Sequence, residues 1–297
     1  MKNWKMNLVV MLGMGIGVAS CSHSSWLTAV DFISTESDVE LTNSEGSIDD
    51  EVDAVSFNSK GVEATALQER LPAGATIDDT GKDAFPRALT IDFGDGVEDR
   101  KKCRKKGQII VEMSEDMAVI GAKRTTTFKD FSVKGRQITG TKVMTTVSVS
   151  AEGQPEFLVE TNLTMIDKKG TTITKIATGT NTWRAGFGDD DRFNDVFVMK
   201  GTATVEVNNE VMTRTVVEPL LVDRSCEYIK QGIVELDKNG MISSIDFGDG
   251  NCDAIATVTK DGDTYEIDLE EERVDHGKGK CNKEVPTTSD DIAQNNS

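Results

Sequence analysis

The sequence has few of the residues on which most catalytic and nucleic-acid-binding sites depend. Histidine occurs only at His23 and His276, and neither lies in a strongly patterned segment. A Ser-His-Asp triad or a His-ligated metal therefore has little support. Basic residues are outnumbered, because 33 Lys and Arg face 51 Asp and Glu and the formal net charge is −18. Binding nucleic-acid phosphates requires a basic face, so we expect no nucleic-acid partner.

Aromatic residues make up 5% of the chain, and only 5 residues are proline. Hydrophobic residues reach 37%, which permits a folded core and leaves room for segments without one. Among 51 acidic residues, no single carboxylate pair stands out as the acid and base of a glycosidase. The sequence therefore predicts a protein that is not an enzyme, with a carboxylate-dependent envelope hydrolase as the weaker alternative.

Residues 1–20 have the layout of a signal peptide. Lys2 and Lys5 precede an uncharged apolar run over residues 8–18, which is too short to span a bilayer. The residues that follow, Val18-Ala19-Ser20-Cys21, resemble the lipobox of bacterial lipoproteins. In that family the cysteine thiol receives a diacylglycerol, the signal is cut just before the cysteine, and the new amine is acylated. The resemblance implies that Cys21 carries acyl chains such as palmitate.

Several acyl chains on one residue anchor a protein durably, whereas a single chain binds a membrane only reversibly. Ser22 follows the cysteine, without the Asp that favours inner-membrane retention in enteric bacteria, so we expect the outer membrane. Ordinary secretory cleavage after Ser20, which would leave a free thiol, is the alternative.

Composition divides the mature chain into three parts. Residues 21–87 are rich in Ser, Thr, Asn and acidic side chains, and their apolar residues keep no clear period. We therefore predict a lipidated cysteine followed by an acidic, mostly disordered tether, with two helical turns near residues 62–70. Residues 88–270 form a β domain, and residues 271–297 read as a flexible C-terminal tail.

From residue 89 to residue 269, apolar and polar residues alternate with period two. In residues 196–207 one face carries Phe197, Met199, Gly201, Ala203, Val205 and Val207. Turn signals such as Lys134-Gly135, Asn208-Asn209, Asn239-Gly240 and Asp261-Gly262 separate the strands. Short turns give antiparallel pairing. The pattern predicts an all-β fold, either an antiparallel β-sandwich or a strongly curved, partly closed sheet.

Four cysteines remain once Cys21 is set aside for lipid: Cys103, Cys226, Cys252 and Cys281. An even number in an exported protein predicts disulfides. If Lys238-Asn239-Gly240 forms a three-residue hairpin loop, Cys226 lies opposite Cys252. That bridge leaves Cys103 to pair with Cys281 by elimination. No close Cys-x₂-Cys spacing supports a zinc site.

The hexapeptide Ile-Asp-Phe-Gly-Asp-Gly occurs twice, at residues 91–96 and 245–250. Aspartates in glycine turns usually bond their own backbone, so we interpret both copies as turns at strand ends. The alternative is one calcium site, because calcium prefers carboxylate oxygens. Its candidate ligands are Asp92, Asp95, Asp246, Asp249 and Asp253. No other cofactor is expected.

A basic stretch over residues 100–106 surrounds Cys103 in this acidic chain. Clustered cations concentrate potential locally, so this stretch could bind a phosphate-bearing lipid or an acidic glycan. The alternative is a solvated loop that Glu98 and Asp99 neutralise.

Several motifs follow one another in a characteristic order. After the lipobox come Ile-Asp-Phe-Gly at 91–94, Gly-Gln-Ile-Ile-Val at 107–111, Thr-Trp-Arg-Ala-Gly at 182–186, Asp-Val-Phe at 195–197, Glu-Pro-Leu at 218–220, Cys226, Cys252-Asp253 and Ala-Thr-Val-Thr at 256–259. This order is similar to that in a family of uncharacterised lipoproteins of the Gram-negative cell envelope. The resemblance implies a location and names no catalytic residue.

The sequence thus predicts a lipid-anchored cell-envelope lipoprotein that acts as a binding or structural module at the outer membrane. Its expected partners are the membrane, through the lipid anchor, and a glycan, a lipid or another envelope protein. The alternative is a periplasmic lipid or assembly carrier whose curved sheet encloses an acyl chain in an apolar cavity. The sequence leaves open whether the domain faces the periplasm or the cell surface.

Overall fold

The computed structural model describes residues 36–57, 63–80, 84–99, 103–189, 191 and 194–269. In this part of the chain one antiparallel sheet contains all of the strands, in the order β1-β2-β4-β5-β6-β7-β8-β9-β10-β11-β12-β13-β14, with β3 paired to β4. The element bounds are α2 Glu36–Ser56, α3 Ala64–Glu69, β1 Thr76–Asp79, β2 Arg87–Asp92, β3 Val97–Glu98, β4 Arg104–Met113, β5 Lys123–Val133, β6 Arg136–Val149, β7 Pro155–Ile166, β8 Thr172–Ala185, β9 Val196–Val207, β10 Glu210–Asp223, β11 Gln231–Lys238, β12 Met241–Asp249, β13 Ile255–Lys260 and β14 Asp263–Asp268.

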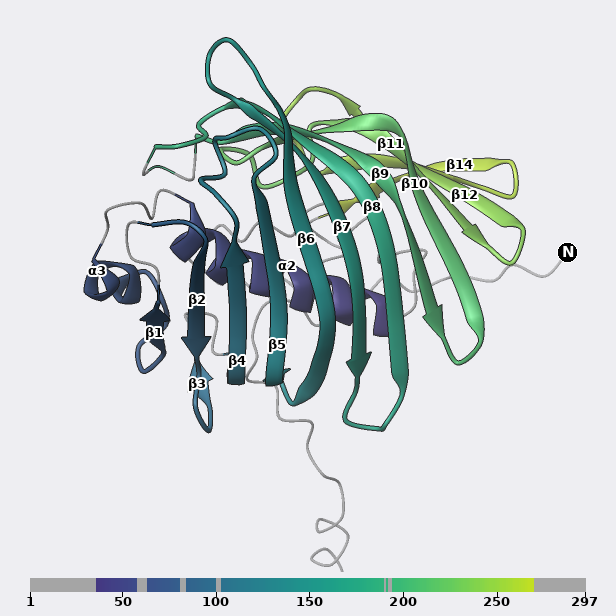
Figure 1. Cartoon of the computed structure of the whole chain (residues 1–297). Coiled ribbons are helices and arrows are strands. Elements are labelled where there is room, and N and C mark those ends of the chain that lie inside the picture. The colour runs from purple at the N-terminus through teal and green to yellow at the C-terminus, as the bar shows by residue number, and fades with distance from the viewer. Residues whose placement is uncertain are drawn as a thin grey trace, which may run out of the picture.

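The sheet is strongly curved and does not close into a barrel. Strands β10 to β14 turn back toward the side of the sheet that carries α2, so that α2 lies across the concave face (Figure 1). The prediction of an all-β, strongly curved sheet is therefore confirmed. The sandwich alternative is wrong, because the described strands form one hydrogen-bonded sheet rather than two.

The predicted alternation in residues 196–207 holds. Val205 is almost fully buried and Phe197 is 7% exposed, whereas Glu206, the residue after Val205, is exposed to solvent. Four of the predicted turns are two-residue hairpin loops in which both residues have positive φ, the geometry that matches the twist of paired strands. These loops are Lys134-Gly135, Asn208-Asn209, Asn239-Gly240 and Asp261-Gly262.

Close backbone contacts accompany the curvature of the long central strands. Gly179 of β8 lies directly opposite Gly201 of β9. A Cβ on Gly179 would lie 2.3 Å from the carbonyl oxygen of Lys200, and a Cβ on Gly201 would lie 2.6 Å from the Cα of Gly179. Glycine is therefore needed on both strands at the level where the two backbones approach most closely.

The predicted tether is wrong for much of its length. Within residues 21–87 the structure forms α2, α3, β1 and the start of β2. The short helix predicted near residues 62–70 is confirmed as α3, Ala64–Glu69. The physical reason for the error is that α2 is stabilised by what it packs against, because most helical stability in proteins comes from tertiary packing. The predicted signal peptide and the C-terminal tail over 271–297 lie outside the described residues.

Candidate binding cavity beneath helix α2

The apolar side of α2 belongs to the main core. Leu41, Ile48, Val52 and Val55 are between 0% and 2% exposed and pack with side chains from strands β2, β4, β5, β6, β7, β8 and β9. The spacing of these four residues places them on one face of a helix. The helix is thus fixed across the concave face by burial of a narrow apolar stripe.

Acidic side chains of α2 form ion pairs with basic side chains that rise from the same face of the sheet. Glu51 accepts a hydrogen bond from Lys105 of β4 at 2.5 Å, and Asp53 accepts one from Arg124 of β5 at 2.8 Å. Lys105 and Arg124 are 1% and 3% exposed. A buried charge is costly unless it is paired, so these contacts tie the helix to the sheet.

Two further acids of α2 share the lysines at the edge of the cavity. Lys142 of β6 donates to Glu45 at 2.9 Å and to Asp49 at 2.6 Å, and Lys175 of β8 also donates to Glu45. Burial alone would raise the pKa of Glu45, but the charges of Lys142 and Lys175 outweigh burial and hold that pKa well below its usual range. Burial would lower the pKa of Lys142, and the charges of Asp49 and Glu45 reverse that effect and raise it.

The pKa of Asp49 is shifted in the opposite direction from that of Glu45. Burial raises the pKa of Asp49 from 3.8 to about 6, since the attraction of Lys142 is offset by repulsion from Glu45 and Asp53. Two carboxylates that share one lysine therefore have widely separated pKa values.

A cavity of about 250 Å³ lies between α2 and the concave face. Helix residues Glu45, Gly46, Asp49, Asp50 and Asp53 line one side of it. Its apolar lining on the sheet consists of Met144, Val159, Ala177, Trp183, Phe197, Met199, Ala203, Val216, Leu220, Val222 and Val234. The volume lies just below the range of about 300–1,000 Å³ that is typical of drug-sized ligand sites, so the cavity suits a smaller molecule.

The floor of the cavity is hollow because small residues lie opposite each other. Ala177 of β8 pairs with Ala203 of β9, and one level further along the same two strands Gly179 pairs with Gly201. All four residues line the cavity. Large side chains at these inward-facing positions would fill the space, so the sequence of the two central strands creates it.

One end of the cavity is aromatic. Trp183 of β8 stacks on Phe197 of β9 with ring centroids 4.7 Å apart, and Phe57, just after α2, packs edge-on against Trp183. The guanidinium carbon of Arg224 lies 5.8 Å from the centre of the Phe197 ring. In the described part of the chain, Trp183 Nε1 and Arg224 Nε are buried and have no hydrogen-bond partner.

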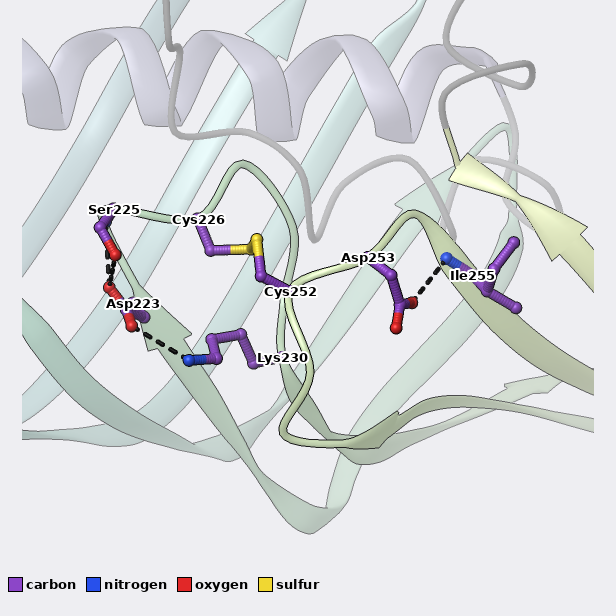
Figure 2. Close-up of a disulfide and its surroundings, with 7 residues drawn as sticks. All are labelled: Asp223, Ser225, Cys226, Lys230, Cys252, Asp253 and Ile255. Carbon is purple, nitrogen blue, oxygen red and sulfur yellow. Dashed lines mark hydrogen bonds and ion pairs between the residues drawn. A yellow bond between two sulfur atoms is a disulfide. The ribbon is translucent and has the colours of Figure 1, made fainter.

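The predicted disulfide between Cys226 and Cys252 is confirmed (Figure 2). Cys226 also lines the cavity, so the bridge holds part of the cavity wall. Beside the bridge, Asp223 accepts hydrogen bonds from Ser225 and Lys230, which orders the chain on either side of Cys226 (Figure 2).

The hairpin that led to this prediction differs from the one expected. Its loop has two residues, Asn239-Gly240, so Lys238 pairs with Met241. The register of the strand pair then shifts once, between Gln231 and Ile233, and both cysteines lie outside the paired strands. The partners were predicted correctly, but the three-residue loop was wrong because both loop residues adopt positive φ.

Cys103 is disulfide-bonded and 6% exposed. Its expected partner, Cys281, and the expected lipid-bearing residue, Cys21, lie outside the described residues, so both assignments stay predictions. Near Cys103 the basic stretch is only partly available to solvent. Lys105 is buried and paired with Glu51 and with Asp99 at 3.4 Å.

The aspartates proposed for calcium do not gather into one cluster. Asp92 and Asp246 accept hydrogen bonds from the backbone N–H groups of Gly94 and Gly248, as expected of turns. For Asp92 this bond and one from the side chain of Gln108 lower the pKa. Asp253 likewise accepts from the backbone of Ile255, and Asp249 accepts from the Asn251 side chain. Across the described ranges, no group of three or more His, Cys, Asp or Glu side chains is placed to hold a metal.

Sequence reasoning did not find the cavity or the acids of α2. The spacing of Leu41, Ile48, Val52 and Val55 was a signal for the helix, but polar residues between them obscured it. No family model, curated protein or solved structure matches this chain. In the described ranges no helix is both long and apolar enough to cross a membrane.

Proposed function

We propose that this protein is a lipid-anchored lipoprotein of the cell envelope that binds a small apolar or amphipathic molecule in the cavity beneath α2. The cavity is the observation that carries the binding role. Its apolar floor is shaped by register-matched small residues, and a smaller number of charged side chains complete the lining, which is the usual arrangement of a small-molecule site. A lipid carrier would use the same cavity and is the second candidate.

The lipid anchor rests on the lipobox at Cys21. Mass spectrometry of the mature N-terminus should find Cys21 as the first residue with a diacylglycerol and an amide-linked acyl chain. Labelling with radioactive palmitate should mark the wild type and should be lost in Cys21→Ala. An unmodified N-terminal peptide from the wild type would refute the anchor and leave the binding role to be judged separately.

The binding role can be measured with the cavity's own tryptophan. The other two tryptophans of the chain are Trp4, which is removed with the signal peptide, and Trp26, so the mature lipidated Trp26→Phe protein in lipid nanodiscs reports from Trp183 alone. Titration with decanol, a neutral amphiphile, should change the Trp183 emission and saturate.

Two neighbouring residues on β8 provide a matched pair of variants. Ala177→Phe fills the cavity and should weaken decanol binding by about tenfold, which is the loss of one good apolar contact. Ile176→Phe places the same ring on the opposite face, where Ile176 is 64% exposed, and should leave binding unchanged. Equal binding by both variants would show that decanol does not occupy the cavity.

A further inference from the structure

We infer that the aromatic end of the cavity receives an anionic headgroup, so that the ligand is an amphiphile with one carboxylate or phosphate and a short acyl or alkyl chain. This inference rests on the proposed function and names the chemical class of the ligand. It is carried by a pair of buried N–H donors, by the positive charge of Arg224 and by the apolar floor that continues from them.

Both donors belong to side chains that pack against the Phe197 ring. Trp183 is 6% exposed and stacks on Phe197, while the Arg224 side chain is 10% exposed and its guanidinium lies over the same ring. Neither Trp183 Nε1 nor Arg224 Nε has a hydrogen-bond partner in the described part of the chain. Buried polar groups are nearly always paired, and an orphaned donor is costly. Acceptor oxygens of a ligand bound at this end of the cavity would supply partners for these donors.

Arg224 supplies a buried positive charge at this end of the cavity, and Glu227, three residues further along the chain, also belongs to the lining. At the opposite end, the acids of α2 neutralise Lys142 and Lys175. Arg224 forms an ion pair with Asp195, whose Oδ2 lies 3.7 Å from Arg224 Nε, beyond hydrogen-bond distance. A carboxylate or phosphate could therefore accept the hydrogen bond that Arg224 Nε lacks.

The apolar floor gives such a ligand one orientation. From Trp183 and Phe197 the cross-strand ladder of β8 and β9 passes through Met199 to the small residues Gly179 and Ala177. An alkyl chain whose headgroup lies at Arg224 would follow this ladder toward Ala177 and the Lys175–Glu45 ion pair. The reverse orientation would place the anion against Glu45 and Asp49, which repel it.

The test compares ligands that share a chain and differ in headgroup. Decanoate, decyl phosphate, decanol and decyltrimethylammonium are titrated into the mature lipidated Trp26→Phe protein in nanodiscs, with Trp183 emission as the readout. Decanoate and decyl phosphate should bind about tenfold or more tightly than decanol, as expected when a buried donor gains a charged acceptor. Decyltrimethylammonium should bind most weakly.

Variants of Arg224 separate headgroup recognition from folding. Arg224→Gln should bring decanoate and decyl phosphate down to the affinity of decanol and leave decanol binding unchanged, whereas Arg224→Lys should keep part of the preference. Lys230→Gln is the matched control, because Lys230 is a nearby cation paired with Asp223 and does not line the cavity. It should retain the full preference for anions.

The outcomes distinguish the two proposals. If all four ligands bind equally, or if Arg224→Gln weakens all of them equally, the anionic headgroup is refuted while the binding role stands. If no ligand changes the Trp183 emission, the binding role fails and the headgroup proposal fails with it. Preference for only one of the two anions would identify which headgroup the site accepts.

Discussion

Glu45 and Lys175 lie 130 positions apart in the sequence and form an ion pair that joins α2 to β8. Both residues are more than nine-tenths buried. Glu45 also accepts a hydrogen bond from Lys142, so one carboxylate connects the helix to two strands of the concave face. Its position at the lining of the cavity means that the same contact both holds the helix and closes one side of the proposed site.

Removal of the Glu45 carboxylate should be strongly destabilising. Glu45→Ala leaves Lys175 buried without its carboxylate, and breaking a buried ion pair by removing one partner costs about 3–5 kcal/mol. Alanine favours the helix, so the loss reflects the ion pair rather than helix propensity. Urea unfolding at neutral pH, followed by circular dichroism, gives the free energy of unfolding.

Two comparisons make this measurement specific. Adding Lys175→Met to Glu45→Ala should recover much of the loss, because removing both members of a buried pair is often nearly neutral. Glu210→Ala breaks a solvent-exposed pair with Lys238 and should cost less than about 1 kcal/mol. A Glu45→Ala protein as stable as the Glu210→Ala protein would contradict the role given to Glu45.

Asp49 should make stability depend on pH in the opposite direction from most paired carboxylates. Its pKa in the folded protein is raised to about 6 from 3.8, so between those values the folded state binds more protons than the unfolded state. Stability from this group is therefore present at low pH and is lost as pH rises from about 4 to about 6. The full shift corresponds to about 3 kcal/mol, and we expect about 1 kcal/mol because a third of the side chain reaches solvent.

The measurement is a difference between two proteins at two pH values. Free energies of unfolding of the wild type and of Asp49→Asn are compared at pH 4.5 and at pH 7.5. Asp49→Asn should gain stability relative to the wild type on going to the higher pH, because it lacks the carboxylate that must ionise. A difference that is constant with pH, or that moves the other way, would show that Asp49 ionises normally in the folded state.

The strands could be predicted because they carry their own signal. In β9 every second residue is apolar or small, and the Asn-Gly and Asp-Gly turns between strands have the φ preferences that two-residue loops need. The Cys226–Cys252 bridge could be predicted because the chain between the two cysteines contains one hairpin. These features depend on residues close together in sequence.

Helix α2 and the cavity could not be predicted in the same way. The apolar stripe of α2 is narrow, and acids such as Glu51 and Asp53 resemble those of a solvated tether until their partners Lys105 and Arg124 are placed in space. The cavity depends on Ala177 facing Ala203, and residues 186–195 between the two strands form no two-residue hairpin loop that would fix this register from the sequence. The position of α2 and the shape of the cavity both depend on contacts between segments that are far apart in the sequence.

Replacing either of two glycines with alanine should change the stability of the protein, in opposite directions at the two positions. Gly179→Ala places a methyl group 2.3 Å from the carbonyl oxygen of Lys200, which forces the backbones of β8 and β9 apart and should cost about 1–3 kcal/mol. Gly46→Ala lies in the interior of α2 with nothing within 4 Å of the new Cβ, and should stabilise the protein by about 0.5–1 kcal/mol. Thermal unfolding of both variants beside the wild type measures the two effects, and a stable Gly179→Ala protein would rule out the close approach.

The disulfide should support both stability and the cavity wall. Cys226 and Cys252 are separated by 26 positions, and cross-linking a loop of that length is worth about 3.5 kcal/mol in the chain-entropy model. The double variant Cys226→Ser/Cys252→Ser should lose about that amount in urea unfolding.

In the same variant, decanol should bind more weakly, because Cys226 lines the cavity and Arg224 lies two residues before it. Single serine variants are avoided since each would leave an unpaired thiol that can form other disulfides. Leu89→Ala serves as the control for stability, because Leu89 is fully buried in the core and does not line the cavity, and its truncation should cost about 2–5 kcal/mol with the bridge intact. If Leu89→Ala weakened decanol binding as much as the double variant, the weaker binding would follow from lower stability and not from the loss of the bridge.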